Sequence, residues 1–374
     1  MNITIPFGTR PEIVKLAPVI TLLREANWRL RLIFTGQHHD PALGEKFLTE
    51  FAVVPDVHWS LPDSPGRRLG TLLEQAVAEL VDHRPNLVLL LGDTYTVPFF
   101  CLAARHAGVP VAHLEAGLRS FNETSMEEVN RRVAAATASL HLAPTNLAAK
   151  FLRAEGISSQ RIHVVGNPVI DVMVASGAKR CPPENRRGLL ITAHRASNVD
   201  NPRRLSALVD TISSATKMVG SGTFPVHPRT QQRLHETGLD EQLRSVGVDL
   251  IAPQPYRAML ELIARARVVV TDSGGLQEEA SWLGVPVVVL RSSTPRWEGV
   301  TLGSAELVGL NPDLAAKAVR RFAAPNEQNR VAAIPCPYGL GDSARRILDV
   351  LKDPATEPLL QLTEPNFIGK EPPQ

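Results

Sequence analysis

The sequence predicts two doubly wound α/β domains, and three observations support this fold class. A chain of 374 residues is long for a single hydrophobic core and suits two domains of ordinary size. Short apolar runs alternate with longer segments of helical spacing, and the runs are continuously apolar, as is typical of parallel strands buried on both faces. The alternation occurs on both sides of a polar segment, so each half is expected to build its own parallel sheet.

The first domain is expected over residues 1–175. Between its strands, residues 71–83 and 126–140 repeat apolar side chains at helical spacing. The predicted strands are the apolar runs at 2–7, 30–35, 86–92, 109–115 and 161–166.

The second domain is expected over residues 176–352. It opens with SGAKRCPPENRRG (176–188), a polar segment with two prolines and no periodicity, which we predict to be the hinge. Residues 353–374 form a proline-rich tail, which is expected to be ordered only where it packs on the body. The predicted strands of this half lie at 188–194, 248–254, 266–273 and 285–291.

Composition and charge exclude several classes of function. The 40 basic and 38 acidic residues leave a net charge of +2, which gives no global field for a nucleic acid or a membrane. The three cysteines form no Cys-x-x-Cys pair, which disfavours a disulfide framework or zinc site and fits a reducing cytosol. No basic stretch precedes a long apolar one at the N-terminus, and no run reaches about 18 apolar residues. We therefore expect a cytoplasmic protein.

Polar and glycine residues follow many of the predicted strands. Ligands of open parallel sheets bind beyond the carboxyl ends of the strands. A small-molecule ligand in a cleft between two facing domains is the economical explanation for this pattern. The strand-end groups are Gly8-Thr9-Arg10, Gly92-Asp93-Thr94 and Glu115-Ala116-Gly117 in the first half, and His194-Arg195 and Asp272-Ser273-Gly274-Gly275 in the second.

The stretch TDSGGLQEEA (271–280) has the features of a nucleotide site. Ser273, Gly274 and Gly275 precede a segment of helical pattern, where backbone N–H groups would bind an anion and missing Cβ atoms would let it approach. Glu278 and Glu279 are expected in the first helical turn, where a carboxylate could accept bonds from ribose hydroxyls. We therefore predict diphosphate at residues 273–275 and ribose at Glu279. The alternative is a plain helix N-cap with a tight turn.

Eight segments in order along the chain resemble the non-hydrolysing UDP-N-acetylglucosamine 2-epimerase family. They are GTRPEIVKLAPVI (8–20), TGQHHD (35–40), GDT (92–94), HLEAGLRS (113–120), EEVNRR (127–132), GNPVID (166–171), TAHR (192–195) and TDSGGLQEEA (271–280). The resemblance runs nearly from end to end. It implies two Rossmann-like domains facing a cleft, as in the glycosyltransferase-B class, and interconversion of UDP-GlcNAc and UDP-ManNAc without metal or nicotinamide.

The family's reaction implies roles for particular residues. Members expel UDP by anti elimination to give a 2-acetamidoglucal, and then return UDP after protonation from the other face. This needs acid–base groups on both faces of the sugar and cations around the diphosphate. The resemblance assigns catalysis to Asp93, Glu115, Glu127 and His194, and substrate binding to Arg10, Lys15, Arg131, His227 and Arg296 beside Ser273, Gly274, Gly275 and Glu279.

Several of these residues have structural alternatives. Asp93 could be a helix N-cap, and Arg119 could anchor its loop by a salt bridge. Ser125 and Glu128 have the spacing of a capping box, which would make Glu128 structural and leave Glu127 free for chemistry.

Residues near Gln37 and His38 lie where the family has a second, activating UDP-GlcNAc site. The nearby His38-His39-Asp40 could resemble a metal cluster, but it lacks a partner motif, so no metal is expected. A homodimer and a role in cell-surface polysaccharide biosynthesis are also expected.

The sequence departs from the family pattern at several points. Ser197 stands where the family usually has a glutamate, Met126 replaces a proline, and Trp297 lies in a TPRWE segment where the family has TERPE. The histidine motif continues as Pro228-Arg229-Thr230. We hypothesise that Ser197 and Trp297 retune substrate choice, the alternative being drift without effect.

The alternatives for the activity as a whole are a hydrolysing epimerase releasing ManNAc and UDP, a glycosyltransferase of the same fold, and a regulator that binds the nucleotide sugar and has lost turnover.

Overall fold

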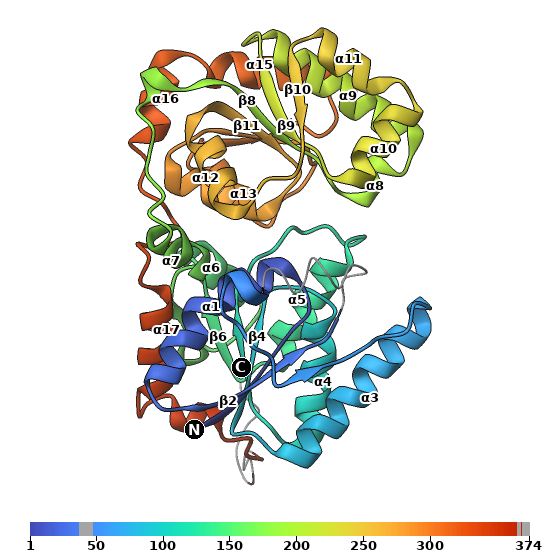
Figure 1. Cartoon of the computed structure of the whole chain (residues 1–374). Helices are drawn as coiled ribbons and strands as arrows, with labels where there is room; N and C mark the ends of the chain where they lie inside the picture. The colour runs from blue at the N-terminus through green and yellow to red at the C-terminus, as the bar shows by residue number, and fades with distance from the viewer. Residues whose placement is uncertain (37–47, 365–367, 369–374) are drawn as a thin grey trace. The chain divides into compact units, whose positions relative to one another are not determined.

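The computed structural model describes residues 1–36, 48–364 and 368, and the chain divides into two compact units (Figure 1). Unit 1 comprises Met1–Gly117, Glu123–Val165 and Ala344–Gln374, and unit 2 comprises Leu118–Asn122 and Gly166–Ser343. Each unit contains a parallel sheet with helices on both faces, so the predicted fold class is confirmed.

Among the described residues, unit 1 has a seven-stranded sheet in the order β3-β2-β1-β4-β5-β6-β7. Its elements are β1 (Asn2–Phe7), α1 (Arg10–Glu25), β2 (Arg29–Phe34), β3 (Val57–His58), α3 (Pro65–His83), β4 (Leu87–Leu91), α4 (Thr96–Ala107), β5 (Val111–Leu114), α5 (Met126–Thr137), β6 (Leu140–Ala143), α6 (Asn146–Ala154), β7 (Ile162–Val164) and, from the end of the chain, α17 (Ser343–Lys352) and the 3-10 turn η3 (Glu357–Leu360).

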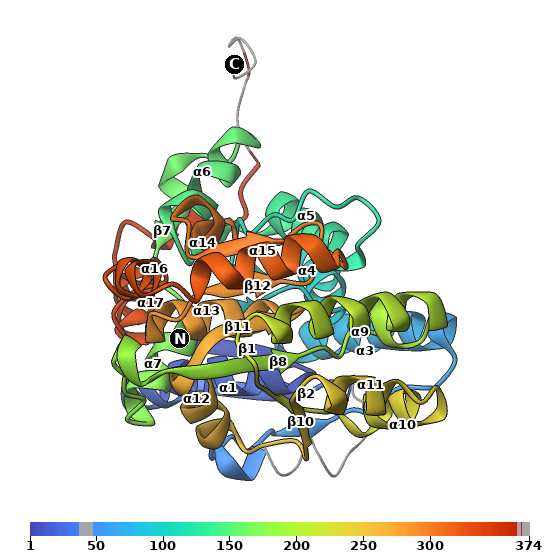
Figure 2. The same cartoon turned by 90° about the horizontal axis from the view of Figure 1, so that it is seen from above.

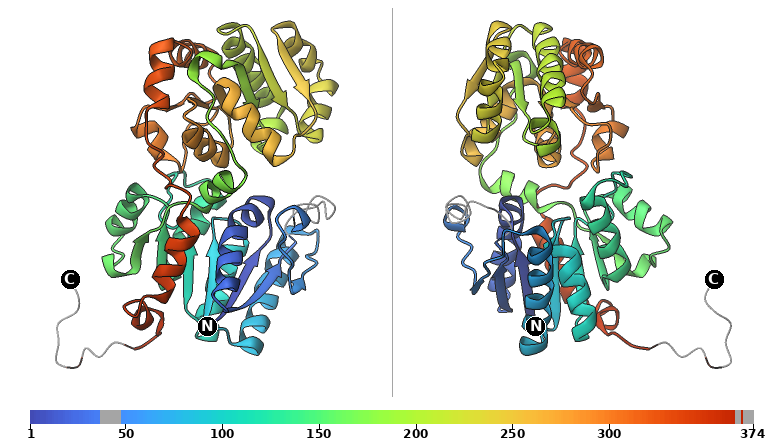
Figure 3. Two further views of the ribbon diagram at one scale, coloured as in Figure 1. Left: turned by 60° about the vertical axis from the view of Figure 1, so that its left-hand side comes forward. Right: turned by 90° about the vertical axis from the view of Figure 1, so that its right-hand side faces the viewer.

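Strand β4 shows why this sheet is covered on both faces. Successive side chains of a strand point to opposite sides. Leu87, Leu89 and Leu91 pack in a core with α1 and α17, whereas Val88 and Leu90 pack in a second core with α3 and α4. A continuously apolar run therefore serves two cores at once. The views in Figure 3 show α17 lying against the sheet of unit 1.

Among the described residues, unit 2 has a six-stranded parallel sheet in the order β10-β9-β8-β11-β12-β13. Its elements are α7 (Pro168–Ala175), β8 (Arg187–Thr192), α8 (Ala196–Val199), α9 (Pro202–Lys217), β9 (Gly222–Pro225), α10 (Pro228–Glu236), α11 (Leu239–Ser245), β10 (Val248–Ile251), α12 (Tyr256–Arg265), β11 (Ala266–Thr271), α13 (Gly274–Leu283), β12 (Val287–Val289), α14 (Trp297–Thr301), β13 (Ala305–Leu307), α15 (Pro312–Phe322) and α16 (Pro325–Ala332).

The helices of unit 2 cover its sheet in pairs. Helices α9 and α15 pack together on one face, and α12 packs with α13 (Figure 2). Asn311 and Asn201 begin α15 and α9, each accepting hydrogen bonds from two main-chain N–H groups of the first turn. Leu208, Ile212, Val319 and other side chains of this pair share one core with β8, β9 and β11.

All nine predicted strands are present, and the described residues contain four further short strands that were not predicted. Strands β3, β6, β9 and β13 span only two to four residues each. Their sequences VH, LHLA, GTFP and AEL mix apolar with polar, glycine or proline residues. They have too little periodicity to be recognised, and they form because a neighbouring strand offers hydrogen bonds.

The expected domain boundaries differ from the observed units at both ends of the second domain. Segment 176–188, which we predicted to be the hinge, lies inside unit 2 and is bonded to it. Arg180 donates to the main-chain oxygens of Trp282 (2.7 Å) and Ala332 (3.0 Å). The fully buried Arg186 donates to those of Gly284 (2.7 Å) and Leu283 (3.2 Å).

The chain instead changes units at 165/166 and 343/344, with a short excursion at Leu118–Asn122. Residues from Ala344 onwards belong to unit 1 because α17 places Ala344, Ile347, Leu348 and Leu351 in its core. The start of the tail packs there too, through Leu359 and Leu360. Within the described residues, no helix combines the length and the apolarity needed to cross a membrane.

Candidate active site

The strand order of each sheet reverses once, and the candidate residues lie at these reversals. In unit 1 the reversal falls between β1 and β4, and in unit 2 between β8 and β11. A crevice opens at such a point because the connections on its two sides run to opposite faces of the sheet. The loops after β1 and β4 carry Arg10 and Asp93, and those after β8 and β11 carry His194 and Ser273.

Lys15 and Glu115 form a buried ion pair in unit 1. Lys15 lies in the second turn of α1, and its ammonium donates to Oε1 of Glu115, directly after β5. The side chains are 7% and 6% exposed. Glu115 has a φ of +61°, which is uncommon for a residue with a side chain and must be held by its surroundings. Its Oε2 lies 3.7 Å from the position that a Cβ at Gly92 would occupy, beside the end of β4.

Asp93 is held by Arg131 from α5. Nε and Nη2 of Arg131 donate to Oδ2 of Asp93 at 2.9 and 2.7 Å, and Nη1 donates to Glu128. Asn130 Nδ2 donates to the main-chain oxygen of Asp93 at 2.8 Å. Asp93 is therefore not an N-cap, because α4 starts after Tyr95 and the carboxylate faces the guanidinium instead. One Arg131 thus lies between two carboxylates.

The expected capping box at the start of α5 is wrong. The Ser125 side chain makes no capping bond, and its hydroxyl donates to Oε2 of Glu127. Glu128 is 1% exposed and bonded to Arg131, so its structural role is to hold that cation. Glu127 is partly exposed at the start of the helix. Arg10, the first residue of α1, is also partly exposed.

Glu12, which was not predicted as a site residue, is bonded to two of the strand-end loops. It is 2% exposed, and its carboxylate accepts bonds from Gly8 N (3.1 Å), Thr9 Oγ1 (2.7 Å) and Thr94 Oγ1 (3.1 Å). Burial raises its pKa to about 7, against the lowering effect of these bonds, and the nearby charge of Asp93 adds to the rise. The signal was a carboxylate leading directly into the apolar stretch IVKLAPVI.

In unit 2, Asp272 ties the end of β11 to the end of β8. The two strand ends are adjacent, since Thr271 and Thr192 are paired in the sheet. Asp272 is fully buried and accepts from the main-chain N–H groups of His194 (3.3 Å) and Arg195 (3.1 Å). The imidazole Nδ1 of His194 lies 3.4 Å from Oδ1 of Asp272, while 55% of this side chain is exposed. His194 is thus oriented from its main chain and presents its ring to solvent.

The start of α13 combines helix N–H groups with a cation. Ser273 occupies the N-cap position without a side-chain capping bond, and α13 begins at Gly274. A Cβ at Gly274 would lie 3.3–3.6 Å from the guanidinium of Arg296, so this glycine allows the arginine to approach. Nothing lies within 4 Å of the corresponding position at Gly275. The first main-chain N–H groups of α13 and the guanidinium of Arg296 therefore lie side by side in unit 2. Together they form a favourable site for an anion.

Glu278 and Glu279 are in the second turn of α13, so their expected position in the first turn is wrong. The helix begins at Gly274, with no acidic residue in its first turn. Glu278 is fully buried, accepting from Asn167 Nδ2 (3.0 Å) and Arg296 Nε (2.9 Å). It therefore holds the arginine at the helix start. Glu279 is 8% exposed, and its role toward ribose stays a prediction.

His227 has a local structural task. It precedes α10, where its Nδ1 accepts a bond from Arg229 N at 3.3 Å. Partial burial of the ring lowers its pKa, and the neighbouring charges of His194 and Arg229 lower it further. The charge of His194 therefore acts on His227 within unit 2.

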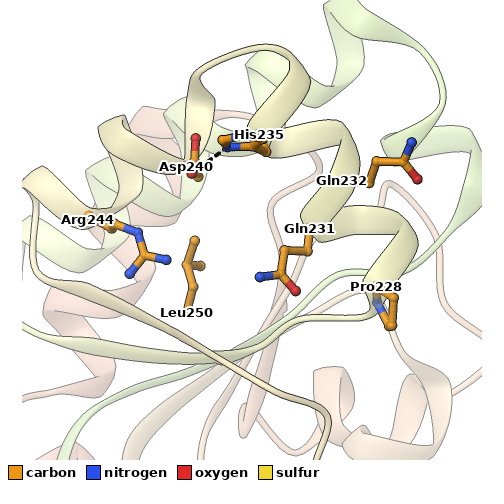
Figure 4. A pocket seen from close by; sticks show the side chains of 7 residues that line it. All are labelled: Pro228, Gln231, Gln232, His235, Asp240, Arg244 and Leu250. Carbon is orange, nitrogen blue, oxygen red and sulfur yellow. Dashed lines mark ion pairs between the residues drawn. The ribbon is translucent and has the colours of Figure 1, made fainter.

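A pocket in unit 2 begins next to His227, at Pro228. It is lined by α10, α11 and the edge strand β10, and the ion pair of His235 with Asp240 (3.6 Å) lies at its rim (Figure 4). The lining side chains are Pro228, Gln231, Gln232, His235, Asp240, Arg244 and Leu250. None of them was predicted as a site residue.

Across the part of the chain that the structure describes, no group of three or more His, Cys, Asp or Glu side chains is placed to hold a metal ion. Gln37 and His38, the expected second UDP-GlcNAc site, lie outside the described residues, as do His39 and Asp40.

Comparison with known proteins identifies the family. A family model described as UDP-N-acetylglucosamine 2-epimerase matches residues 21–352. The chain belongs to the UDP-N-acetylglucosamine 2-epimerase family. The family resemblance inferred from the eight sequence segments is confirmed.

Relatives of this epimerase family match over nearly their whole length. The UDP-N-acetylglucosamine 2-epimerase of Methanococcus maripaludis is 36% identical over 365 residues, covering 94% of this chain and 98% of its own. A UDP-2,3-diacetamido-2,3-dideoxy-D-glucuronate 2-epimerase of Pseudomonas aeruginosa is 32% identical over 362 residues, covering 94% and 99%.

A solved epimerase structure has the same fold. The crystal structure of Methanocaldococcus jannaschii UDP-GlcNAc 2-epimerase, in complex with UDP-GlcNAc and UDP, is 35% identical to this chain. It covers 94% of this chain and 99% of its own, with a TM-score of 0.84. The glycosyltransferase-B-like class, built from two Rossmann-like sheets, is therefore confirmed for this member of the family.

Proposed function

We propose that the protein is an epimerase that inverts C2 of a UDP-2-acetamido sugar, of the UDP-GlcNAc/UDP-ManNAc type. The observation that carries this proposal is the arrangement in unit 1, where two carboxylates are each paired with a cation. Glu115 is bonded to Lys15, and Asp93 to Arg131. The two carboxylates lie in the loops after neighbouring strands, β4 and β5, on one side of the strand-order reversal, and the two cations lie in α1 and α5.

These pairs suit an elimination reaction. In the first step a carboxylate takes the proton from C2 while the bond between C1 and the UDP oxygen breaks, giving a 2-acetamidoglucal and UDP. In the second, a proton returns to C2 on the other face and the UDP oxygen bonds to C1 again. A carboxylate can act as the base toward C2, and a cation can stabilise the negative charge that develops on the departing diphosphate. The proposed catalytic residues are Asp93, Glu115, Glu127 and His194.

The nucleotide is assigned to unit 2 at the start of α13. Support comes from the helix N–H groups at residues 273–275 and from the guanidinium of Arg296 beside Gly274. The relative from Methanocaldococcus jannaschii, with 35% identity, was solved with UDP-GlcNAc and UDP. We place the diphosphate at residues 273–275 and the ribose at Glu279, with Arg10, Lys15, Arg131 and His227 as further substrate-binding groups.

The sugar could carry further substituents. The relative from Pseudomonas aeruginosa is named for a diacetamido glucuronate sugar and is 32% identical. The chain also departs from the expected family pattern at Ser197, at the partly exposed Trp297 and at Arg229 in α10. We therefore propose a UDP-2-acetamido sugar as the substrate class.

Incubation with UDP-GlcNAc and UDP-linked 2-acetamido sugars in deuterated water tests the function. NMR of the anomeric protons should show conversion to the C2 epimer, with deuterium appearing at C2 of the sugar. Release of free ManNAc and UDP would instead assign the hydrolysing reaction. Saturable binding of every sugar in the panel without deuterium at C2 would assign a regulator and overturn the proposal.

Three further properties belong to the proposal. The protein is expected to act in the cytoplasm, to supply cell-surface polysaccharide biosynthesis and to form a homodimer. A second UDP-GlcNAc is proposed to bind near Gln37 and His38 as an activator. Sedimentation tests the dimer, and sigmoidal dependence of the rate on UDP-GlcNAc tests the activator.

A further inference from the structure

The segment Leu118–Asn122 lies between two of the proposed catalytic carboxylates, yet it packs in unit 2. Residues on both sides of it belong to unit 1, and Glu115 and Glu127 flank it. Gly117 has a φ of +84°, and a Cβ there would lie 2.3 Å from the main-chain oxygen of Ala148. The chain therefore leaves unit 1 at a position that only glycine can occupy without rearrangement.

The side chain of Trp297 contacts this segment at two points, the main chain of Arg119 and the ring of Phe121. The indole Nε1 donates to the main-chain oxygen of Arg119 at 2.9 Å. The rings of Trp297 and Phe121 are 6.5 Å apart between centroids and tilted by 48°. Phe121 itself has a φ of +54°, an uncommon backbone conformation that its surroundings must maintain. Leu118, Arg119 and Ser120 are buried.

The part of unit 2 that carries Trp297 is itself well fixed. The preceding residue, Arg296, is bonded to buried Glu278 at the start of α13. The following residue, Glu298, is 6% exposed and accepts a bond from the buried hydroxyl of Tyr338 at 3.2 Å. Trp297 is also the first residue of α14. The indole is therefore a rigid attachment point, adjacent in sequence to the cation that we assign to the diphosphate.

Tryptophan suits this task for a specific chemical reason. Among the large apolar side chains it alone adds a strong N–H donor to a broad ring. A main-chain oxygen as acceptor makes the bond independent of the side chain at position 119. The bond and the ring contact together fix both the position and the direction of the segment.

We propose that Trp297 is a positioning residue that fixes the Leu118–Asn122 segment to unit 2 and thereby sets the placement of Glu127. This inference rests on the proposed function. Glu115 is held independently by its strand and by Lys15. Glu127 follows the segment by only five residues and bonds back to Ser125, within the same stretch of chain. Release of the segment therefore acts mainly on Glu127.

The test replaces Trp297 by phenylalanine, which keeps an apolar ring facing Phe121 and removes the N–H donor. The matched control is Trp282→Phe, the same change at a partly exposed position of α13. Hydrogen exchange of the amides in 118–122 should become about tenfold faster in Trp297→Phe, as expected for the loss of one hydrogen bond. The control should exchange like the wild type.

The kinetic readout distinguishes positioning from general support. We expect kcat on the UDP-sugar to fall by about tenfold in Trp297→Phe, since small misplacement of a reacting group is costly, with KM and UDP affinity changed by less than about threefold. Wild-type exchange rates at 118–122 in Trp297→Phe would overturn the attachment. Faster exchange with unchanged kcat would overturn the positioning role.

A second variant tests the same attachment if Trp297→Phe folds poorly. Phe121→Ala removes the ring contact from the exposed side and leaves the indole donor in place, so exchange should rise there too, by a smaller factor. Wild-type exchange in that variant counts against the ring contact. Because exchange is measured without substrate, it is independent of the assigned reaction. A wild-type protein without any turnover would overturn the proposed function and, with it, the positioning role of Trp297. The attachment of residues 118–122 to Trp297 would still be supported or refuted by the hydrogen-exchange rates alone.

Discussion

Lys15 and Glu115 are 100 residues apart in sequence, and their side chains meet as a buried ion pair in unit 1. The exposed fractions of the two side chains are 7% and 6%, so neither charge is well solvated by water. A buried charge is tolerated because its partner is in place, and removing one partner leaves the other charge uncompensated. The pair therefore couples the stability of unit 1 to groups that we assign to catalysis.

Replacing Lys15 by methionine should destabilise the protein by about 3–5 kcal/mol, since it leaves the Glu115 carboxylate unpaired. Chemical unfolding followed by circular dichroism measures this loss. Adding Glu115→Gln to the same chain should restore most of the stability, because the buried charge is then gone. Lys150→Met, at an exposed position of α6, is the control and should change stability by less than about 0.5 kcal/mol. Equal effects of the two lysine changes would contradict the argument.

The amide variants Asp93→Asn, Glu115→Gln and Glu127→Gln should each lower turnover by about 10²–10⁴-fold, as is typical when an acid–base group is lost. Shape is nearly kept, so UDP affinity should change much less. Steady-state rates and calorimetric titration with UDP provide the two measurements. Glu123→Gln, on the exposed surface nearby, should retain full activity. Near-normal turnover of Glu127→Gln would assign that residue to structure alone.

Glu12 should make stability depend on pH. Its pKa is about 7 in the folded protein, against 4.5 for an unperturbed glutamate carboxyl. Between pH 4.5 and pH 7 the folded state therefore binds more protons than the unfolded state. The contribution of Glu12 to the free energy of unfolding should therefore be greatest below about pH 4.5. It should fall by about 3 kcal/mol as the pH rises through 7.

Glu12→Gln is the variant that tests this pH dependence. A glutamine can accept from Gly8 and Thr9 with its oxygen and donate to the Thr94 hydroxyl with its amide, so the site stays bonded. The melting temperature of this variant should vary less between pH 5 and 8 than that of the wild type. The exposed Glu25→Gln, in the same helix, should keep the wild-type profile. Parallel profiles for wild type and Glu12→Gln would refute the assignment.

UDP should bind more weakly when the start of α13 is altered. Gly275→Ala adds a methyl group where the protein leaves open space, so folding should be unaffected while the diphosphate is obstructed. Glu279→Ala removes the proposed acceptor for ribose. Each should raise the Kd for UDP by at least about tenfold, the loss expected for a bond to a charged group. Gly70→Ala in α3 is a spatially neutral control. Unchanged affinity in both variants would move the nucleotide elsewhere.

Ser197→Glu should change the choice of sugar. Ser197 is exposed on α8, next to the buried Asn198 that binds Asp272, so a larger side chain there does not disturb packing. Restoring the carboxylate should raise kcat/KM for UDP-GlcNAc relative to other UDP-2-acetamido sugars by about fivefold, a change typical of one partly exposed charge. Ser206→Glu on α9 should leave the ratio unchanged. The same ratio in both variants would indicate drift at this position.

Nine strands of the two sheets were predictable because their apolar runs are long enough to be recognised without partners. Strands β1, β4, β8 and β11 are of this kind, and they are also the strands between which the order reverses. The candidate site residues follow these strands or, for Glu115, strand β5, so glycine and polar residues at strand ends indicated the place of Asp93, Glu115, His194 and Ser273. This required only the rule that ligands of parallel sheets bind beyond the carboxyl ends of strands.

Pairings between distant residues were decided only by the tertiary structure. Ser125 and Glu128 have the spacing of a capping box, but the nearby Arg131 binds Glu128 more strongly than a main-chain N–H would. Glu278 was expected near ribose and instead holds Arg296, because its helix begins two residues earlier than its sequence indicated. Local patterns specify which bonds a residue can make, and its neighbours in space determine which bond it makes.

The sequence by itself determined the fold class, the family and the strand-end positions of the candidate site, because these depend on periodicity and on contiguous motifs. Only the tertiary structure decided that 176–188 is bonded within unit 2, that α17 packs in unit 1, that Glu12 bonds to Thr94, and that Trp297 bonds to Arg119. Burial and long-range hydrogen bonds determine these outcomes, and both depend on side chains that approach from distant parts of the chain.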